Sequence, residues 1–309
     1  LNLVNQPLYD TTIFSNNENK RDFFLFGIGL SYKNSKKHEF YSNISQNYRS
    51  VTFSDITISS PTFLIDPNIT DESGYTYDVG IRGVYNSILS FDVNYYGLSY
   101  NNRIGFLQKK IEFIPGFFTT KTQKGNIGDA FIHGFESLLD LSFRNLIKDL
   151  NINSFFNYAY TRSQYIRSET QAIIGNKVEF VPEHNLKCGI DINFRRYTSG
   201  LQLTYLSEQF TDASNALESD MSGILGTIPA YYILDFSSSI DFNKIKFNFG
   251  INNLTNNYYF TRRATGYPGP GIITSPITLE LLVTDRFPSC CGTILDNNLV
   301  PIRNLLAVI

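Results

Sequence analysis

The stretch His184–Phe194, HNLKCGIDINF, alternates polar and mostly apolar residues over its length. One set of alternate positions holds His184, Leu186, Cys188, Ile190, Ile192 and Phe194. The other holds Asn185, Lys187, Asp191 and Asn193. Because successive side chains of a β-strand point to opposite faces of a sheet, this pattern predicts a strand with one apolar and one polar face.

The same alternation recurs along the chain, for example at 88–97 and 244–251. It predicts strands at 22–32, 38–50, 74–85, 88–100, 129–144, 150–163, 183–195, 199–210, 229–240 and 244–254, with a degraded eleventh near 276–284. Most of these are longer than the usual five or six residues of strands in globular proteins. Their length suits tilted strands that cross a bilayer.

The connections between these strands alternate in length. Short ones fall near 34–37, 86–87, 145–149, 196–198 and 243, and long ones near 51–73, 101–128, 164–182, 211–228 and 255–275. Outer-membrane barrels show this asymmetry, with short periplasmic turns and long extracellular loops. A soluble β-sandwich remains an alternative, but it has no reason to sort its loops by length.

The fold prediction is an all-β, antiparallel up-and-down transmembrane β-barrel. Its apolar face would contact outer-membrane lipid, where unpaired backbone groups are so costly that the sheet must close. Its polar face would line the lumen and includes Asp92, Asn94, Asp191, Asn193 and Asp235.

The composition excludes several other classes. The 309 residues carry a net charge of −2, which does not indicate a nucleic-acid partner. Three cysteines, two of them adjacent, form neither a disulfide framework nor a zinc signature. The sequence contains no run of 18 apolar residues, so it predicts no membrane-spanning helix. No catalytic motif predicts an enzyme.

Five longer motifs resemble segments of TonB-dependent outer-membrane receptors. They are EFYSNISQNYRSVTFSDI (39–56), GNIGDAFIHGFESLLDLSF (125–143), FVPEHNLKCGIDINF (180–194), SEQFTDASNA (207–216) and GTIPAYYILDFSSSIDFNKIKFNFGINNLTNNYYFTRR (226–263). The resemblance covers about residues 20–273. It is closest to the ferric-citrate-type branch, through YRSVTFSD and YYFTRRATGYPGPGI.

This resemblance implies a plugged barrel of about 22 strands, of which residues 1–273 would be the C-terminal part with about ten or eleven strands. The N-terminal plug domain would be missing from the chain. The implied function is import of a ferric chelate, such as ferric citrate or a siderophore, through the outer membrane of a Gram-negative cell. The partner would be the TonB energy-transducing complex, and neither an enzymatic activity nor a cofactor is expected.

Two alternatives stay open. An importer of vitamins, haem or glycans would share the same scaffold. A smaller outer-membrane barrel acting as an enzyme or adhesin should carry a catalytic constellation at one rim, and none is visible.

Residues 274–309 depart from the family pattern. Alternation fades after Ile273, and Cys290 and Cys291 are adjacent. We interpret this segment as an atypical tail, which a reading-frame slip near Thr274 would explain.

The candidate ligand-binding residues are Arg49, Arg262 and Arg263, because guanidinium groups bind carboxylates bidentately. The alternative is that these arginines are solvated or paired with nearby loop carboxylates. Arg103, Arg162 and Arg167 lie on the same rim with less to distinguish them. His133 and His184 are far apart in sequence, which favours packing over metal ligation. Tyr258, Tyr259 and Phe260 are expected at the rim of the barrel rather than in a base-stacking site.

Overall fold

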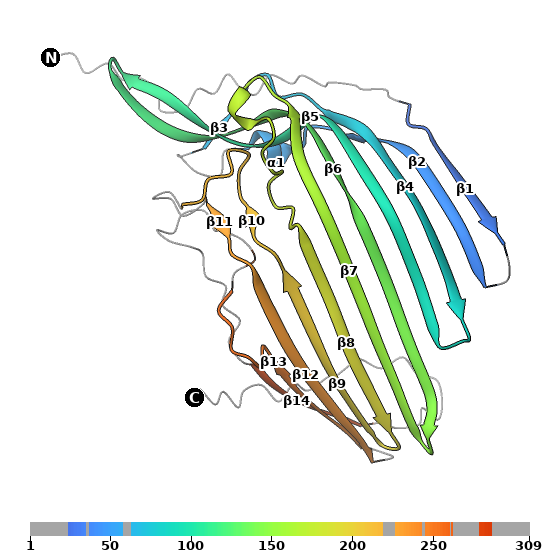
Figure 1. The fold of residues 1–309 in the computed structure, drawn as a ribbon. Helices are drawn as coiled ribbons and strands as arrows, with labels where there is room; N and C mark the ends of the chain where they lie inside the picture. Colours follow the sequence, from blue (N-terminus) through green and yellow to red (C-terminus); the bar gives the residue numbers. More distant parts are fainter. Residues whose placement is uncertain are drawn as a thin grey trace, which may run out of the picture.

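The computed structural model describes residues 24–34, 37–57, 63–218, 226–242, 245–259, 261 and 278–285. They form one large curved sheet (Figure 1). Eleven antiparallel strands follow one another in it: β1 (Gly27–Lys33), β2 (His38–Arg49), β4 (Glu72–Tyr85), β5 (Leu89–Ile114), β6 (Phe117–Ile147), β7 (Leu150–Arg167), β8 (His184–Phe194), β9 (Tyr197–Leu206), β12 (Tyr231–Phe242), β13 (Ile245–Asn252) and β14 (Thr278–Asp285).

Each of these strands pairs with the next one along the chain, so the topology is up-and-down, as predicted. Tight turns join the strands at one end. At Asn86–Ser87 both residues have positive φ, 50° and 56°, which is the geometry of the two-residue turn that suits a twisted hairpin. The longer connections lie at the opposite end, at the top of Figure 1. The predicted sorting of connections by length is therefore confirmed for the connections at 51–73, 164–182 and 211–228, whereas most of 255–275 lies outside the described residues.

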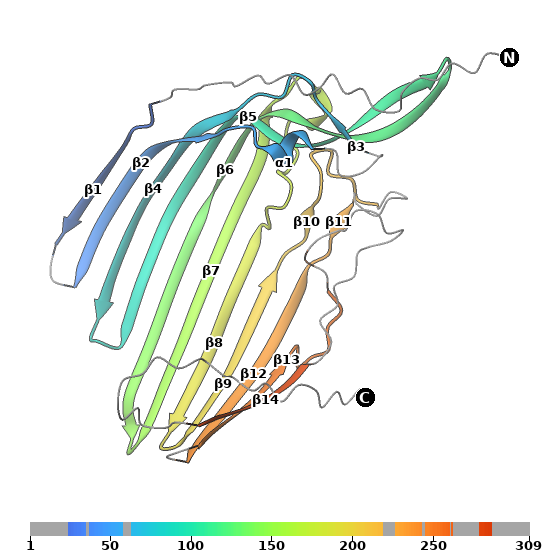
Figure 2. The same cartoon turned by 180° about the vertical axis from the view of Figure 1, so that it is seen from behind.

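For the fifth, at 101–128, the prediction of a long loop is wrong. β5 and β6 run through this segment and form a paired hairpin that projects past the sheet in both views (Figures 1 and 2). Ile114 pairs with Phe117 around Pro115 and Gly116, and Gly116 has a φ of 83°. Proline followed by a positive-φ glycine is a turn signal, so this stretch closes a hairpin instead of an irregular loop.

Smaller elements occupy the other long connections. α1 (Phe53–Ile56) and β3 (Phe63–Ile65) lie between β2 and β4, and β3 pairs parallel with β6. The 3₁₀ turn η2 (Gln171–Ile173) follows β7. The predicted strand 199–210 ends at Leu206, and its last residues form β10 (Gln209–Phe210), paired with β11 (Thr227–Ile228). The predicted eleventh strand near 276–284 is β14.

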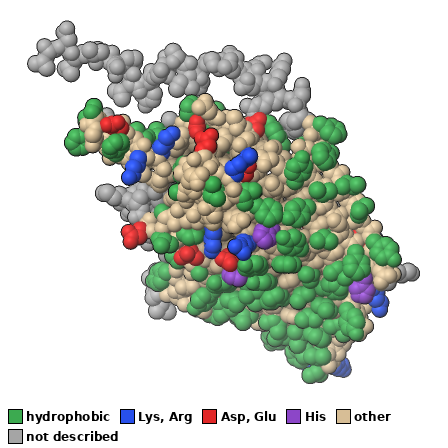
Figure 3. All heavy atoms as spheres, turned by 45° about the horizontal axis from the view of Figure 1, so that its top comes forward, with side chains coloured by type: hydrophobic (Ala, Val, Ile, Leu, Met, Phe, Trp, Pro, Cys, Tyr) green, Lys and Arg blue, Asp and Glu red, His purple; other side chains and the backbone are tan. Residues whose placement is uncertain are grey.

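The two faces of the sheet differ in chemistry. Ile190, Leu201 and Phe236 lie side by side on one face, and their neighbours Asp191, Gly200 and Ser237 lie side by side on the other. Apolar side chains cover much of the face seen in Figure 3. The lumen positions predicted from alternation therefore share one face, as a membrane barrel requires.

A small buried core lies at the long-connection end. It consists of Ile127, Ala130, Ile132, Tyr165, Ile173, Val178 and Ala213. These residues come from β6, β7 and the two connections that follow β7 and β10, so this core fixes the long connections to the sheet. Among the described residues, no helix combines the length and the apolar character needed to span a membrane.

Candidate ligand-binding rim

A polar cavity of about 550 Å³ opens at the long-connection end of the sheet. Its wall includes charged side chains from β2, α1, β4, β5, β6 and the connection after β7. They are Arg49, Asp55, Glu72, Arg103, Lys124 and Glu179, and we call them the rim cluster. Figure 2 shows α1, which carries Asp55, beside the upper part of β5.

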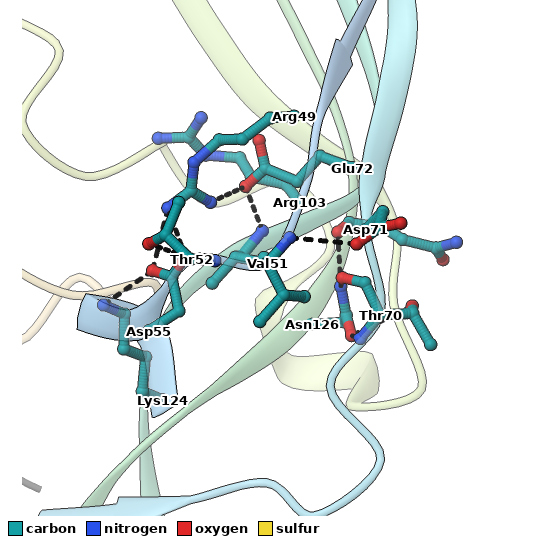
Figure 4. A network of polar contacts seen from close by, with 12 residues as sticks. Arg49, Val51, Thr52, Asp55, Thr70, Asp71, Glu72, Arg103, Lys124 and Asn126 are labelled. Atoms are coloured by element: carbon teal, nitrogen blue, oxygen red, sulfur yellow. Dashed lines mark hydrogen bonds and ion pairs between the residues drawn. The ribbon is translucent and has the colours of Figure 1, made fainter. Parts of the chain in front are cut away.

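Asp55 lies at the centre of one half of the rim cluster (Figure 4). Arg49 donates through one terminal nitrogen to both carboxylate oxygens of Asp55, at 2.8 and 2.9 Å. The Nζ of Lys124 lies 2.8 Å from Asp55 Oδ1. The backbone N–H of Thr52 donates to Asp55 Oδ2 at 2.9 Å. This short helix therefore begins with its first backbone donor satisfied by its own acidic residue.

These contacts control the ionisation of Asp55, whose side chain is fully buried. Burial alone would raise the pKa of its carboxyl. The hydrogen bonds from Lys124, Thr52 and Arg49 outweigh burial and hold the pKa well below its usual range. Asp55 is therefore an anion in the folded protein at neutral pH.

Glu72 joins Arg49 to the base of the hairpin. The second terminal nitrogen of Arg49 donates to Glu72 Oε1 at 3.0 Å. The backbone N–H of Ile104 donates to the same oxygen at 2.5 Å. Arg49 is thus held by two carboxylates, one on each side of its guanidinium group.

The other half of the rim cluster contains Arg103 and Glu179. Tyr165 donates its hydroxyl to Glu179 Oε2 at 2.7 Å, and a terminal nitrogen of Arg103 lies 3.7 Å from Glu179 Oε1. Burial, together with the charge of Glu179, raises the pKa of the Tyr165 hydroxyl. The Nε of Arg103 is buried without a hydrogen-bond partner among the described atoms. Arg103 is therefore the least satisfied cation of the cluster.

The connection between β2 and β4 is fastened to the hairpin base at a second place. The side-chain amide of Asn126 accepts from the backbone N–H of Thr70 at 2.7 Å and donates to the carbonyls of Thr70 and Asn102, at 2.9 and 2.6 Å. The N–H of Val51 donates to Asp71 at 2.9 Å. Figure 4 shows these contacts next to the rim cluster.

The predicted ligand-binding residues are placed only in part. Arg49 lines the cavity, whereas Arg262 and Arg263 lie outside the described residues. Arg103 also lines the cavity, Arg167 pairs with Asp129 at 2.6 Å, and Arg162 lies on the outward face in register with His133. Sequence reasoning missed Asp55, Glu72, Lys124 and Glu179, because nothing in their local motifs shows that they share a cavity with Arg49 and Arg103.

The histidines and aromatic residues form packing contacts. His133 and His184 each share a hydrogen bond with a tyrosine hydroxyl. Tyr259 stacks on Tyr231 with ring centres 4.9 Å apart, Tyr258 is exposed, and Phe260 lies outside the described residues. Within the described part of the chain, no group of three or more acidic, histidine or cysteine side chains could hold a metal ion.

Chemically, the rim cluster is a balanced set of three cations and three carboxylates around an open cavity. An anion that bound Arg49 would have to displace Asp55 or Glu72, or bind above them. A polar ligand without net charge could use the exposed donors without breaking any ion pair. The Nε of Arg103 is buried, so it would have to become exposed before it could donate to a ligand.

Residues 5–254 match the family model described as TonB dependent receptor-like, beta-barrel. Similar solved structures include the ferric citrate transporter FecA in its unliganded form, with 21% identity and a TM-score of 0.63 over 82% of this chain and 37% of that one. The copper transporter OprC has 13% identity and a TM-score of 0.58 over 82% and 37%. The ferric yersiniabactin uptake receptor FyuA from Yersinia pestis has 15% identity and a TM-score of 0.58 over 84% and 37%. The chain thus spans 37% of the length of each of these proteins, and the likeness concerns the fold.

Proposed function

The chain belongs to the TonB-dependent receptor β-barrel family, and on that premise we propose that it is part of an outer-membrane receptor that imports a ferric chelate into a Gram-negative cell. The family comprises receptors and transporters and is not an enzyme class. The proposed ligand is ferric citrate or a siderophore complex. The proposed energy source is the TonB complex, acting through a part of the receptor outside this chain.

The observation that carries the proposal is the position of the rim cluster. It lies at the long-connection end, which is the extracellular end of outer-membrane barrels. It lies at the end of the polar face, so a ligand bound there would face the lumen. Buried and half-buried cations in such a cavity can hold the carboxylate or catecholate oxygens of an iron chelate.

Ferric citrate is proposed on two grounds. Motifs around Arg49 and around Arg262 and Arg263 resemble the ferric-citrate-type branch, and a ferric citrate transporter is among the similar structures. We assign Arg49, Arg262 and Arg263 as ligand-binding residues. Arg49 ends β2 at the long-connection end, and Arg262 and Arg263 follow β13 in the sequence.

The test uses the complete receptor that contains this chain, expressed in cells that depend on it for iron. Arg49→Lys keeps the positive charge but loses the double contact with Asp55, and Arg262→Ala with Arg263→Ala removes two charges. We expect each variant to lower ferric citrate uptake at least about tenfold, as loss of a charged hydrogen bond does. Arg144→Ala near the opposite rim is the matched control and should import normally.

Folding is checked in parallel by the heat-dependent mobility of each receptor in gels. If the folded variants import ferric citrate at the normal rate, these arginines are not part of the site. If even the unmodified receptor fails to import it, ferric citrate is the wrong ligand.

A second ligand class follows from the charge balance of the rim cluster. Since Arg49 and Lys124 are both paired, the described part of the cavity favours a chelate of low net charge over a citrate complex. A panel of ferric citrate, uncharged siderophore complexes, a haem and a cobalamin, each supplied alone, would separate these importers by growth.

A further inference from the structure

Two histidines mark the upper edge of the apolar band on the outward face. His184 begins β8 and Phe194 ends it, and His133 and Phe143 hold the matching positions on β6. Ten residue steps cover about 33 Å along a strand, which at a tilt of about 40° is a height of about 25 Å. This equals the apolar band of outer-membrane barrels, so His133 and His184 lie at the level of the lipid headgroups.

Three basic side chains lie together at this level on three neighbouring strands. His133 of β6 is in register with Arg162 of β7, and Tyr160 of β7 is in register with His184 of β8. Directly paired residues have Cβ atoms about 5 Å apart, and diagonal pairs about 7 Å apart. Figure 3 shows two histidines close together at the edge of the apolar region, with basic and acidic side chains beside them.

Each histidine uses its Nδ1 for a hydrogen bond with a tyrosine. Tyr95 Oη lies 3.1 Å from His133 Nδ1, and Tyr158 Oη lies 2.9 Å from His184 Nδ1. When the tyrosine hydroxyl donates to Nδ1, the ring proton lies on Nε2, which is then a donor for another group. Both rings share this arrangement, although they belong to different strands.

Arg162 adds a full positive charge between the two rings. Its side chain is exposed, and it forms no ion pair or hydrogen bond with any described residue. The nearest acidic residue in sequence to His184 is Glu183, which pairs with Lys177 at 2.8 Å. Glu183 also interacts with His184 and with the Tyr160 hydroxyl, so this carboxylate borders the three basic side chains, with Lys177 as its partner.

We infer that Arg162, His133 and His184 form a binding site for the phosphate group of an outer-leaflet membrane lipid. The guanidinium group matches the geometry of a phosphate, and the two imidazole N–H groups supply further donors. The acyl chains would lie below, along Phe135 and the other apolar side chains of the band, of which Phe135 is 57% exposed.

The site faces away from the lumen, which separates it from the rim cluster. A ligand on its way through the barrel would not meet it. The inference rests on the membrane placement contained in the proposed function, but on neither the ferric chelate nor transport.

The test measures lipid retention by the complete receptor. The receptor is placed in nanodiscs of phosphatidylcholine that contain about one tenth phosphatidic acid. It is then extracted in mild detergent, and the mass of the intact receptor with its bound lipids is measured by native mass spectrometry. We expect at least one phosphatidic acid to stay bound. Arg162→Gln should weaken its retention about fivefold, the effect of one basic residue at a charged membrane surface. Arg144→Gln at the opposite rim should leave retention unchanged.

A second variant, His133→Gln with His184→Gln, keeps the charge of Arg162 and serves if Arg162→Gln fails to fold. It should also lower retention. Equal retention by folded variants and unmodified receptor would overturn the site, and so would an equal loss in Arg144→Gln. Displacement of the lipid by inorganic phosphate at the same phosphate concentration would overturn its assignment to a lipid.

Discussion

At the scale of single residues, Asp55 decides how the connection between β2 and β4 is held. It is buried, and it receives hydrogen bonds from Arg49 and Thr52 and an ion pair from Lys124. Lys124 belongs to β6, far along the chain. Removing this carboxylate would leave two cations without their shared partner, a larger loss than that of an exposed surface pair.

Asp55→Asn should therefore lower the free energy of local opening of this connection by about 1–3 kcal/mol. The measurement is the rate of chymotrypsin cleavage after Phe53 in the folded receptor, with Glu169→Gln, an exposed acidic residue, as control. A cleavage rate equal to that of the control would show that the ion pairs do not hold the loop.

The pH dependence of cleavage in the same loop, followed with pepsin because chymotrypsin is inactive in acid, has a definite sign. Because the pKa of Asp55 is lowered by folding, its stabilising contribution is present above the ordinary carboxyl pKa and is lost only as pH falls through the lower, folded value. Near pH 4, where an unperturbed Asp is about half protonated, the unmodified loop should remain protected. Loss of protection already at that pH would contradict the lowered pKa.

At the scale of elements, the hairpin formed by the ends of β5 and β6 depends on a bend at its base. Gly128 has a φ of 152°, and an added Cβ there would lie 2.0 Å from the carbonyl oxygen of Arg167. Pairing shifts register at the same place, between Tyr100 and Arg103. β-bulges of this kind bend strands and redirect them.

Gly128→Ala should lower the folded fraction of the receptor strongly, since the clash is with backbone that cannot move aside. Gly116→Ala is the matched control, because Gly116 also has positive φ but no atom lies within 4 Å of its added Cβ. It should cost only about 1 kcal/mol. The readout is the fraction of each variant that runs as folded protein in an unheated gel, and equal fractions would show that the bend tolerates a side chain.

At the scale of the whole molecule, the division between a lipid face and a lumen face governs which substitutions the barrel accepts. Leu201 and Gln202 are neighbours in β9 with opposite orientations. Leu201→Arg places a charge in the middle of the apolar band and should destabilise the folded barrel by about 2–4 kcal/mol. Gln202→Arg should change stability little. Urea titrations in lipid measure both, and similar losses would contradict the assigned faces.

A second prediction concerns the open edges of the sheet. Among the described strands, β1 and β14 each pair with a single neighbour. Unpaired backbone groups are very costly in lipid, so this chain expressed alone should not form a stable barrel. A detergent-stable monomer with heat-dependent mobility, made from this chain alone, would contradict this.

The sequence alone predicted most of the sheet. Alternation of apolar and polar residues indicates both that a segment is a strand and which face of the sheet each of its side chains occupies. Every long predicted strand is present among the described residues, and Asp191 and Asp235 lie on the polar face as expected. The same pattern underestimated the lengths of β5 and β6. A bulge and mixed polar residues interrupt the alternation there, so Pro115–Gly116 was the only local signal of the hairpin.

The rim cluster and the outward basic cluster were decided by the tertiary structure. Arg49 could be singled out from the sequence by its place at a strand end, but its partners Asp55 and Glu72 are 6 and 23 positions further along. Lys124, which shares Asp55 with Arg49, is 75 positions further along. His133, Arg162 and His184 come from three strands, and only the register brings them to one height. The alternation of apolar and polar residues predicts which face of the sheet a residue occupies. Which residues meet on that face depends on the pairing of strands and on the bends between them, and those follow from contacts across the whole sheet.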